Sequence, residues 1–156
     1  MLRKILLFGW LVCKNKIPSW ENLGKWGFFI TKICCLCQWS DGNTLHLFFK
    51  CPYAIGTYIY VSKKLKIKIS WGFPTVEADF KYWIVLLQVE NIMHLFIYQG
   101  ICKGHNASIF KDQRYVIGYS SSKICALYCE YRDLWYKDES YYESPASTDL
   151  SYMPFW

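Results

Sequence analysis

The sequence lacks any uninterrupted apolar run of the roughly 18 residues that a membrane-spanning helix requires. Its richest apolar segment, residues 82–98, is interrupted by four polar residues, Gln88, Glu90, Asn91 and His94. The first 13 residues imitate a secretion signal, but Lys14 to Lys16 follow at once and no small-residue cleavage site is present. We therefore expect an intracellular protein, nuclear or cytoplasmic, with reduced thiols and no membrane partner.

The sequence also lacks the common signatures of a catalytic centre. No G-x-x-x-x-G-K-S/T phosphate loop occurs. Among eight cysteines and three histidines, no Cys–His pair stands out with a third residue to orient it. His94 lies in an apolar stretch and reads as a core histidine. We expect the chain itself not to be an enzyme.

Basic and aromatic residues, in contrast, are abundant. The net charge is +6, and aromatic residues make up 20% of the chain. Residues 1–70 hold 11 Lys/Arg and 2 Asp/Glu, whereas residues 71–156 hold 7 and 10. A basic half suits a polyanion such as nucleic acid, although the same lysines also fit an ordinary solvated surface. So many aromatic rings cannot all be buried, which suggests a surface that meets a partner.

Apolar spacing and end signals predict mostly helices. A short, largely buried helix is expected over residues 3–13, and a second should begin after Ser19 and stop at Gly27. Helical spacing returns over residues 44–61, with Pro52 in the early turns or splitting off a first short piece. Further helices are predicted over residues 77–99, parts of 100–111, and 116–136.

The most informative pattern is C-x2-C-x8-H-x4-C, formed by Cys34, Cys37, His46 and Cys51. Zinc prefers four tetrahedral ligands, and Cys3His is a common structural set. A C-x2-C pair lets one tight turn aim two sulfurs at one point, and the Ser-Asp-Gly-Asn turn at residues 40–43 lets the chain reverse. The spacing predicts one Zn2+ site. Cys35 leaves an alternative, because it can replace Cys34 as the first ligand.

The same residues resemble a known family. Residues 8–54 resemble the reverse transcriptase zinc-binding domain found at the C-terminal end of plant LINE-type retrotransposon polyproteins. The similar stretches are Ile17 to Leu23 against L-P-T-R-x-N-L, Cys34 to Cys37 against C-P-L-C, and His46 to Ala54 against H-L-F-x-x-C. Residues 101–111 resemble the helix that often follows this domain.

Three departures accompany the resemblance. Gly42 and Asn43 stand where the family usually has Glu followed by Ser or Thr, His105 replaces an Arg, and Cys102 replaces a Trp. The family's polymerase also needs paired aspartates to hold two metal ions, and no Asp-Asp occurs in this chain. The resemblance therefore implies a C-terminal fragment without the polymerase, with the missing reverse transcriptase domain as one partner.

RNA or single-stranded DNA is the other expected partner. Lys32 and Lys50 flank the cysteine segment and can hold phosphates, while Trp39 lies beside the polar turn and can stack on an unpaired base. Trp20 and Trp26 are expected to pack in the core instead. The alternative is a structural or relic domain, folded by zinc, that binds nothing else.

We therefore predict a mostly α fold: a small helical domain with an inserted Cys3His zinc knuckle, followed by further helices. The expected divisions are the zinc-binding domain at 1–61, a linker at 62–76, a helical C-terminal region at 77–137 and a disordered tail at 138–156. Leu65, Ile67 and Ile69 also alternate as in a strand, but no partner strand is evident.

Overall fold

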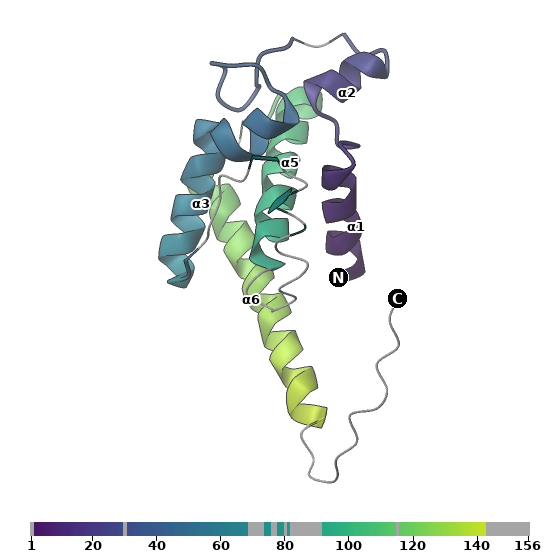
Figure 1. Cartoon of the computed structure of the whole chain (residues 1–156). Coiled ribbons are helices and arrows are strands. Elements are labelled where there is room, and N and C mark those ends of the chain that lie inside the picture. The colour runs from purple at the N-terminus through teal and green to yellow at the C-terminus, as the bar shows by residue number, and fades with distance from the viewer. Residues whose placement is uncertain are drawn as a thin grey trace.

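The computed structural model describes residues 2–29, 31–68, 74–75, 78–79, 81, 92–114 and 116–142. This part of the chain is mostly helical, which confirms the predicted fold class (Figure 1). Its elements are α1 (Leu2–Cys13), α2 (Trp20–Lys25), a short π-helix η1 (His46–Lys50), α3 (Pro52–Leu65), α5 (Met93–Lys111) and α6 (Ile117–Tyr142). No helix in the described ranges is both long and apolar enough to cross a membrane.

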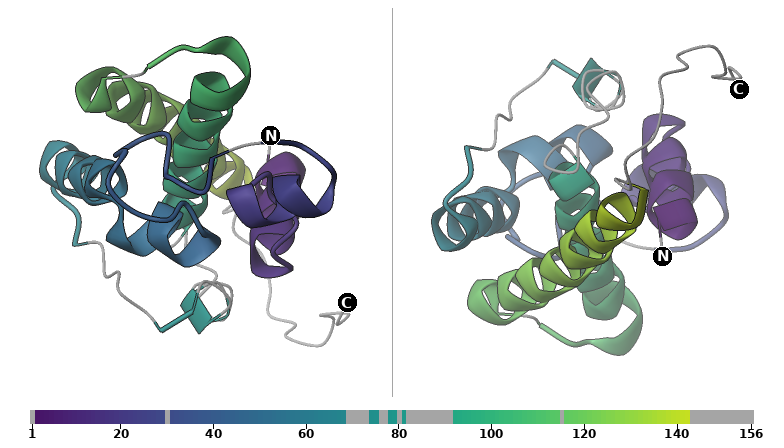
Figure 2. Two further views of the ribbon diagram at one scale, coloured as in Figure 1. Left: turned by 90° about the horizontal axis from the view of Figure 1, so that it is seen from above. Right: turned by 90° about the horizontal axis from the view of Figure 1, so that it is seen from below.

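Helix α5 is the centre of the bundle. Helices α1, α3 and α6 all contact it, and α3 also packs along α6. Residues 26–29 and 31–45 lie at the end of the bundle where α1 stops, and α6 runs away from them toward the opposite end (Figures 1 and 2). The predicted metal ligands therefore lie at one end of the molecule.

The core explains much of the aromatic content. Tyr58, Tyr98 and Tyr128 are fully buried, and the Phe48 ring packs against Tyr98 with centroids 4.6 Å apart. Helix α5 is buried on nearly every side, as a helix enclosed by neighbours must be. His94 is buried there, as predicted, and burial lowers its pKa to about 3.

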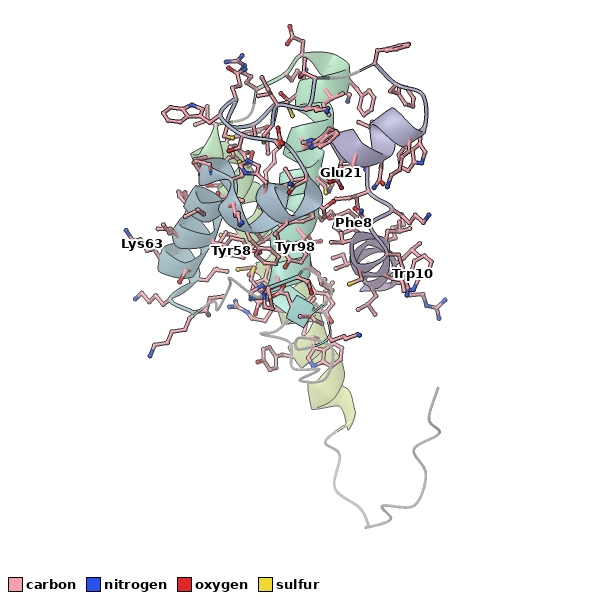
Figure 3. All side chains as sticks on the ribbon, turned by 45° about the horizontal axis from the view of Figure 1, so that its top comes forward. Phe8, Trp10, Glu21, Tyr58, Lys63 and Tyr98 are labelled. Atoms are coloured by element: carbon pink, nitrogen blue, oxygen red, sulfur yellow. The ribbon has the colours of Figure 1, made fainter. Side chains whose placement is uncertain are left out.

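Helix α1 is less buried than predicted. Ile5 and Val12 face the core, but Leu7 and Trp10 are more than half-exposed and half-exposed, respectively. Figure 3 shows Phe8 on the side of α1 toward the bundle and Trp10 on the outward side. The many apolar residues of this segment predicted a largely buried helix, whereas only one face of α1 contacts α5.

Two predicted boundaries are wrong. Helix α5 continues through residues 99 and 100, where a break between two helices was expected. Gly100 lies inside α5 and faces Ile124 of α6, so this glycine allows close packing and does not end the helix. Helix α6 continues past residue 136 to Tyr142; residues 143–156 of the predicted disordered tail lie outside the described residues.

The segment after α3 differs from the predicted linker in its first residues. Helix α3 includes Leu65, so the strand alternative fails there, and it ends at Lys66 in the left-handed conformation (φ 55°). The described residues leave out most of the predicted linker after residue 68. They also leave out most of residues 77–91, the first part of the helix predicted over 77–99. The division into domains stays a prediction.

Two glycines give a matched test of this packing. A Cβ on Gly100 would lie 2.3 Å from Ile124 Cδ1, whereas a Cβ on Gly24 would meet nothing within 4 Å. We expect Gly100→Ala to lower the free energy of unfolding by about 1–3 kcal/mol, because the α5–α6 contact must open. Gly24→Ala should be neutral or stabilising by up to about 1 kcal/mol. Urea unfolding measures both; equal effects would contradict the close α5–α6 contact.

Candidate metal centre

Cys34 and Cys37 lie in a tight turn closed by backbone hydrogen bonds. The Gln38 N–H donates to Cys34 O and the Cys34 N–H donates to Ser40 O, both at 2.7 Å. Gln38 adopts the left-handed conformation (φ 61°), which lets the chain reverse after Cys37. An isolated antiparallel bridge between Ile33 and Asp41 closes the base of this turn. Residues 34–40 thus form a knuckle, the name used below for this turn.

Gly42 fits the chain where it returns past the knuckle. A Cβ there would lie 3.0 Å from Cys34 Cα and 3.2 Å from the Trp20 ring. Its N–H donates to Lys32 O at 2.7 Å. The glycine that departs from the family pattern is therefore the residue that allows this close approach.

His46 and Cys51 are brought together by η1. The Cys51 N–H donates to His46 O at 2.7 Å, a hydrogen bond between residues five apart. In an α-helix two such residues would point about 140° apart around the axis. The wider π turn brings them closer to the same side, and such turns are frequent at functional sites.

The four side chains converge. Their donor atoms, three Sγ and one His nitrogen, all lie within 4.8 Å of one another. Cys34 Sγ is 3.9 Å from Cys51 Sγ, and Cys37 Sγ is 3.3 Å from His46 Nε2. Cys34, His46 and Cys51 are buried, and Cys37 is partly buried.

These separations fit a tetrahedral zinc ion. With Zn–S near 2.3 Å and Zn–N near 2.0–2.1 Å, tetrahedral angles put two sulfurs about 3.8 Å apart and a sulfur and nitrogen about 3.6 Å apart. The measured pairs differ from these values by a few tenths of an ångström. The residues present therefore suit the group that the spacing predicts.

The electrostatics of the cluster also favour a cation. The hydrogen bond from the Cys51 thiol lowers the pKa of Cys34 to about 4 although burial opposes this. The pKa of Cys51 is raised, first by that hydrogen bond and then by burial. Without a positive ion, one sulfur of this buried pair ionises at the expense of the other. A divalent cation removes the conflict, because it stabilises both thiolates.

Cys35 is directed elsewhere. Its thiol donates to the His105 carbonyl at 3.7 Å, and burial raises its pKa to about 11. The Ser108 hydroxyl in turn donates to Cys35 O at 3.4 Å. Cys35 therefore joins the knuckle to α5, and the converging set contains Cys34.

The other predicted residues lie on the surface. Trp39, within the knuckle, is 89% exposed, and Lys50 is exposed at the end of η1. Lys32 is exposed, with Nζ 5.6 Å from the Trp20 ring centroid. Trp20 is partly buried, but Trp26 is half-exposed because it follows the last turn of α2, so its predicted core position is wrong.

Sequence reasoning missed the residues that orient the ligands. The His46 N–H donates to Asn43 Oδ1 at 2.7 Å, so Asn43 caps the helical segment that carries this ligand. Asn22 donates to Ile17 O at 2.8 Å, and the Thr44 hydroxyl donates to Asn15 Oδ1 at 2.6 Å. Asn43 before a returning apolar period is an N-cap signal that could have been found.

The geometry predicts which thiols hold the metal. Protein purified without chelator should contain close to one zinc per chain. Cys51→Ser should lose most of it, because three donors hold zinc less tightly than four. Cys35→Ser and Cys13→Ser should keep it, because neither sulfur belongs to the converging set. Elemental analysis measures these four proteins and Cys34→Ser; zinc lost from Cys35→Ser and retained by Cys34→Ser would contradict the assignment.

Comparison with known proteins gives one match. No curated protein and no solved structure matches the chain. A family model described as zinc-binding in reverse transcriptase matches residues 1–58, which include all four converging side chains. The match supports a reverse transcriptase zinc-binding domain over residues 1–58.

Proposed function

We propose that the chain is a non-catalytic, zinc-binding module that holds single-stranded nucleic acid, RNA or DNA. The observation that carries the proposal is the convergence of three sulfurs and one imidazole on a turn, residues 34–40, that also carries an exposed tryptophan. Four protein ligands leave zinc no open position for substrate, which is the arrangement of structural sites. The metal would then act by fixing the knuckle that presents Trp39.

Trp39 is placed to stack on a base. Its neighbour Gln38 is held by the hydrogen bond to Cys34, and its other neighbour, Ser40, accepts from the Cys34 N–H. The indole therefore projects from a chain fixed on both sides. Stacking on a fixed ring needs little ordering of the protein, and every base has a face that can stack.

The charge around the knuckle suits a phosphate backbone. Three thiolates and one Zn2+ together carry one negative charge. Lys32 and Lys50 flank the ligands and are exposed, and residues 22–40 contain no Asp or Glu. The zinc cluster therefore leaves its surroundings positive.

We further propose that polymerisation belongs to a separate reverse transcriptase domain, which this module would accompany. The proposal rests on the missing Asp-Asp pair and on the family matched by residues 1–58. Nucleotide incorporation by the pure chain, abolished by a point change within it, would contradict this.

A purely structural role is the second candidate. Leu47, Phe48 and Phe49 of η1 are buried, and Phe48 packs on Tyr98 of α5. The metal ligands are thus built into the core of the bundle, as a zinc that only stabilises the fold would require. The two roles differ in what happens at the exposed residues.

Salt dependence separates them. If three or four lysines contact one strand, log affinity should fall with log salt at a slope of about −2 to −3, with micromolar or weaker binding. Lys32→Gln combined with Lys50→Gln should flatten that slope by about 1. The matched control is Lys63→Gln with Lys64→Gln; Figure 3 shows Lys63 on α3, pointing away from the bundle. Fluorescence anisotropy measures each slope, and a salt-independent affinity would favour the structural role.

Trp39→Ala tests stacking directly. It should weaken single-strand binding by about 1–3 kcal/mol and leave duplex binding little changed, because only unpaired bases present a free face. Zinc content should stay the same, because the indole is exposed and Trp39 is not one of the four metal ligands. Equal single-strand affinities for the wild type and Trp39→Ala would show that Trp39 does not belong to the proposed binding site.

A further inference from the structure

A second exposed ring lies near the knuckle. Phe29 is 107% exposed, so its whole side chain faces solvent. Burying a phenylalanine is normally favourable by about 1.5–3 kcal/mol, so this exposed ring, on the segment that leads to the exposed Trp39, is available to a partner.

The position of Phe29 is set by its neighbours. Helix α2 ends at Lys25, the positive φ of Gly27 (86°) then turns the chain, and the Phe28 N–H donates back to Leu23 O at 2.9 Å. The Phe28 ring then meets Phe110 of α5 edge to face, with centroids 6.4 Å apart. The chain is therefore anchored through the residue before Phe29, which leaves Phe29 projecting outward.

The two exposed rings lie within reach of one strand. The bridge between Ile33 and Asp41 connects their segments, so chain geometry keeps the Phe29 and Trp39 Cα atoms within about 27 Å. A strand of 12 nucleotides extends about 40 Å at the stacked rise of 3.4 Å. Lys25 and Lys32 are exposed in the same stretch, and no acidic residue lies between them.

We infer that Phe29 is a second stacking platform, and that an unpaired nucleic-acid strand crosses the end of the bundle from Trp39 to Phe29. The inference rests on the proposed function and extends it from the knuckle to the loop after α2. The contact between Phe28 and Phe110 makes α5 a support for this site, although α5 lies outside the family match.

The test uses the full chain with zinc and two probes, a fluorescent 12-nucleotide thymidine strand and the same strand in a duplex. Phe29→Leu keeps an apolar side chain and removes the ring, so it should weaken strand binding about fivefold to a hundredfold. Phe29→Trp should bind at least as well as the wild type. Duplex affinity should change less than twofold. Tyr136→Leu is the matched control: this ring is half-exposed and belongs to the last turns of α6 (Ile117–Tyr142), the helix that runs away from the knuckle (Figure 1).

Three results would overturn the inference. Wild-type strand affinity in Phe29→Leu, with a loss in Trp39→Ala, would remove the second platform and leave the proposed function standing. No strand binding by zinc-loaded wild type would remove both. A dimer that Phe29→Asp converts to a monomer, with strand affinity unchanged in Phe29→Leu, would assign the ring to contact between copies of the chain.

Discussion

The structure of this end of the molecule depends on the convergence of four metal donors in a small space. Buried sulfurs 3.9 Å apart cannot both ionise without a nearby positive charge, because their repulsion is poorly screened away from water. A zinc ion held by the four side chains would supply that charge and would join the knuckle to η1. We therefore expect the exposed surface of the knuckle to be ordered only while a metal ion holds the four side chains together.

The metal centre is also coupled to the helical bundle. On one side, η1 inserts Phe48 against Tyr98 of α5, and on the other, Cys35 and Ser108 join the knuckle to the same helix. Asn15 and Thr44 connect the end of α1 with the start of the segment that carries His46. Loss of metal should therefore be felt in α1 and α5, and binding at the knuckle should depend on a folded bundle.

The sequence predicted the local features more reliably than the tertiary ones. Ligand spacing and the glycine stop after α2 are short-range signals, and the structure has both. The chain reverses at Gln38, inside residues 34–40, so the predicted reversal at residues 40–43 is misplaced by a few residues. The continuity of α5 through Gly100 could not be read locally, because it depends on the distant Ile124. The exposure of Phe29 likewise follows from Phe28 meeting Phe110, a contact between segments 82 residues apart. Burial and helix continuity are decided by such partners, which a single sequence does not name.

X-ray absorption at the zinc edge of the purified chain tests directly whether three cysteines and one histidine hold zinc. We expect one zinc per chain with three sulfur neighbours at about 2.3 Å and one nitrogen neighbour at about 2.0–2.1 Å. The Cys51→Ser protein should show fewer sulfur neighbours or no bound zinc. A wild-type spectrum dominated by oxygen ligands, or a folded chain that takes up no zinc at all, would contradict the Cys3His zinc site.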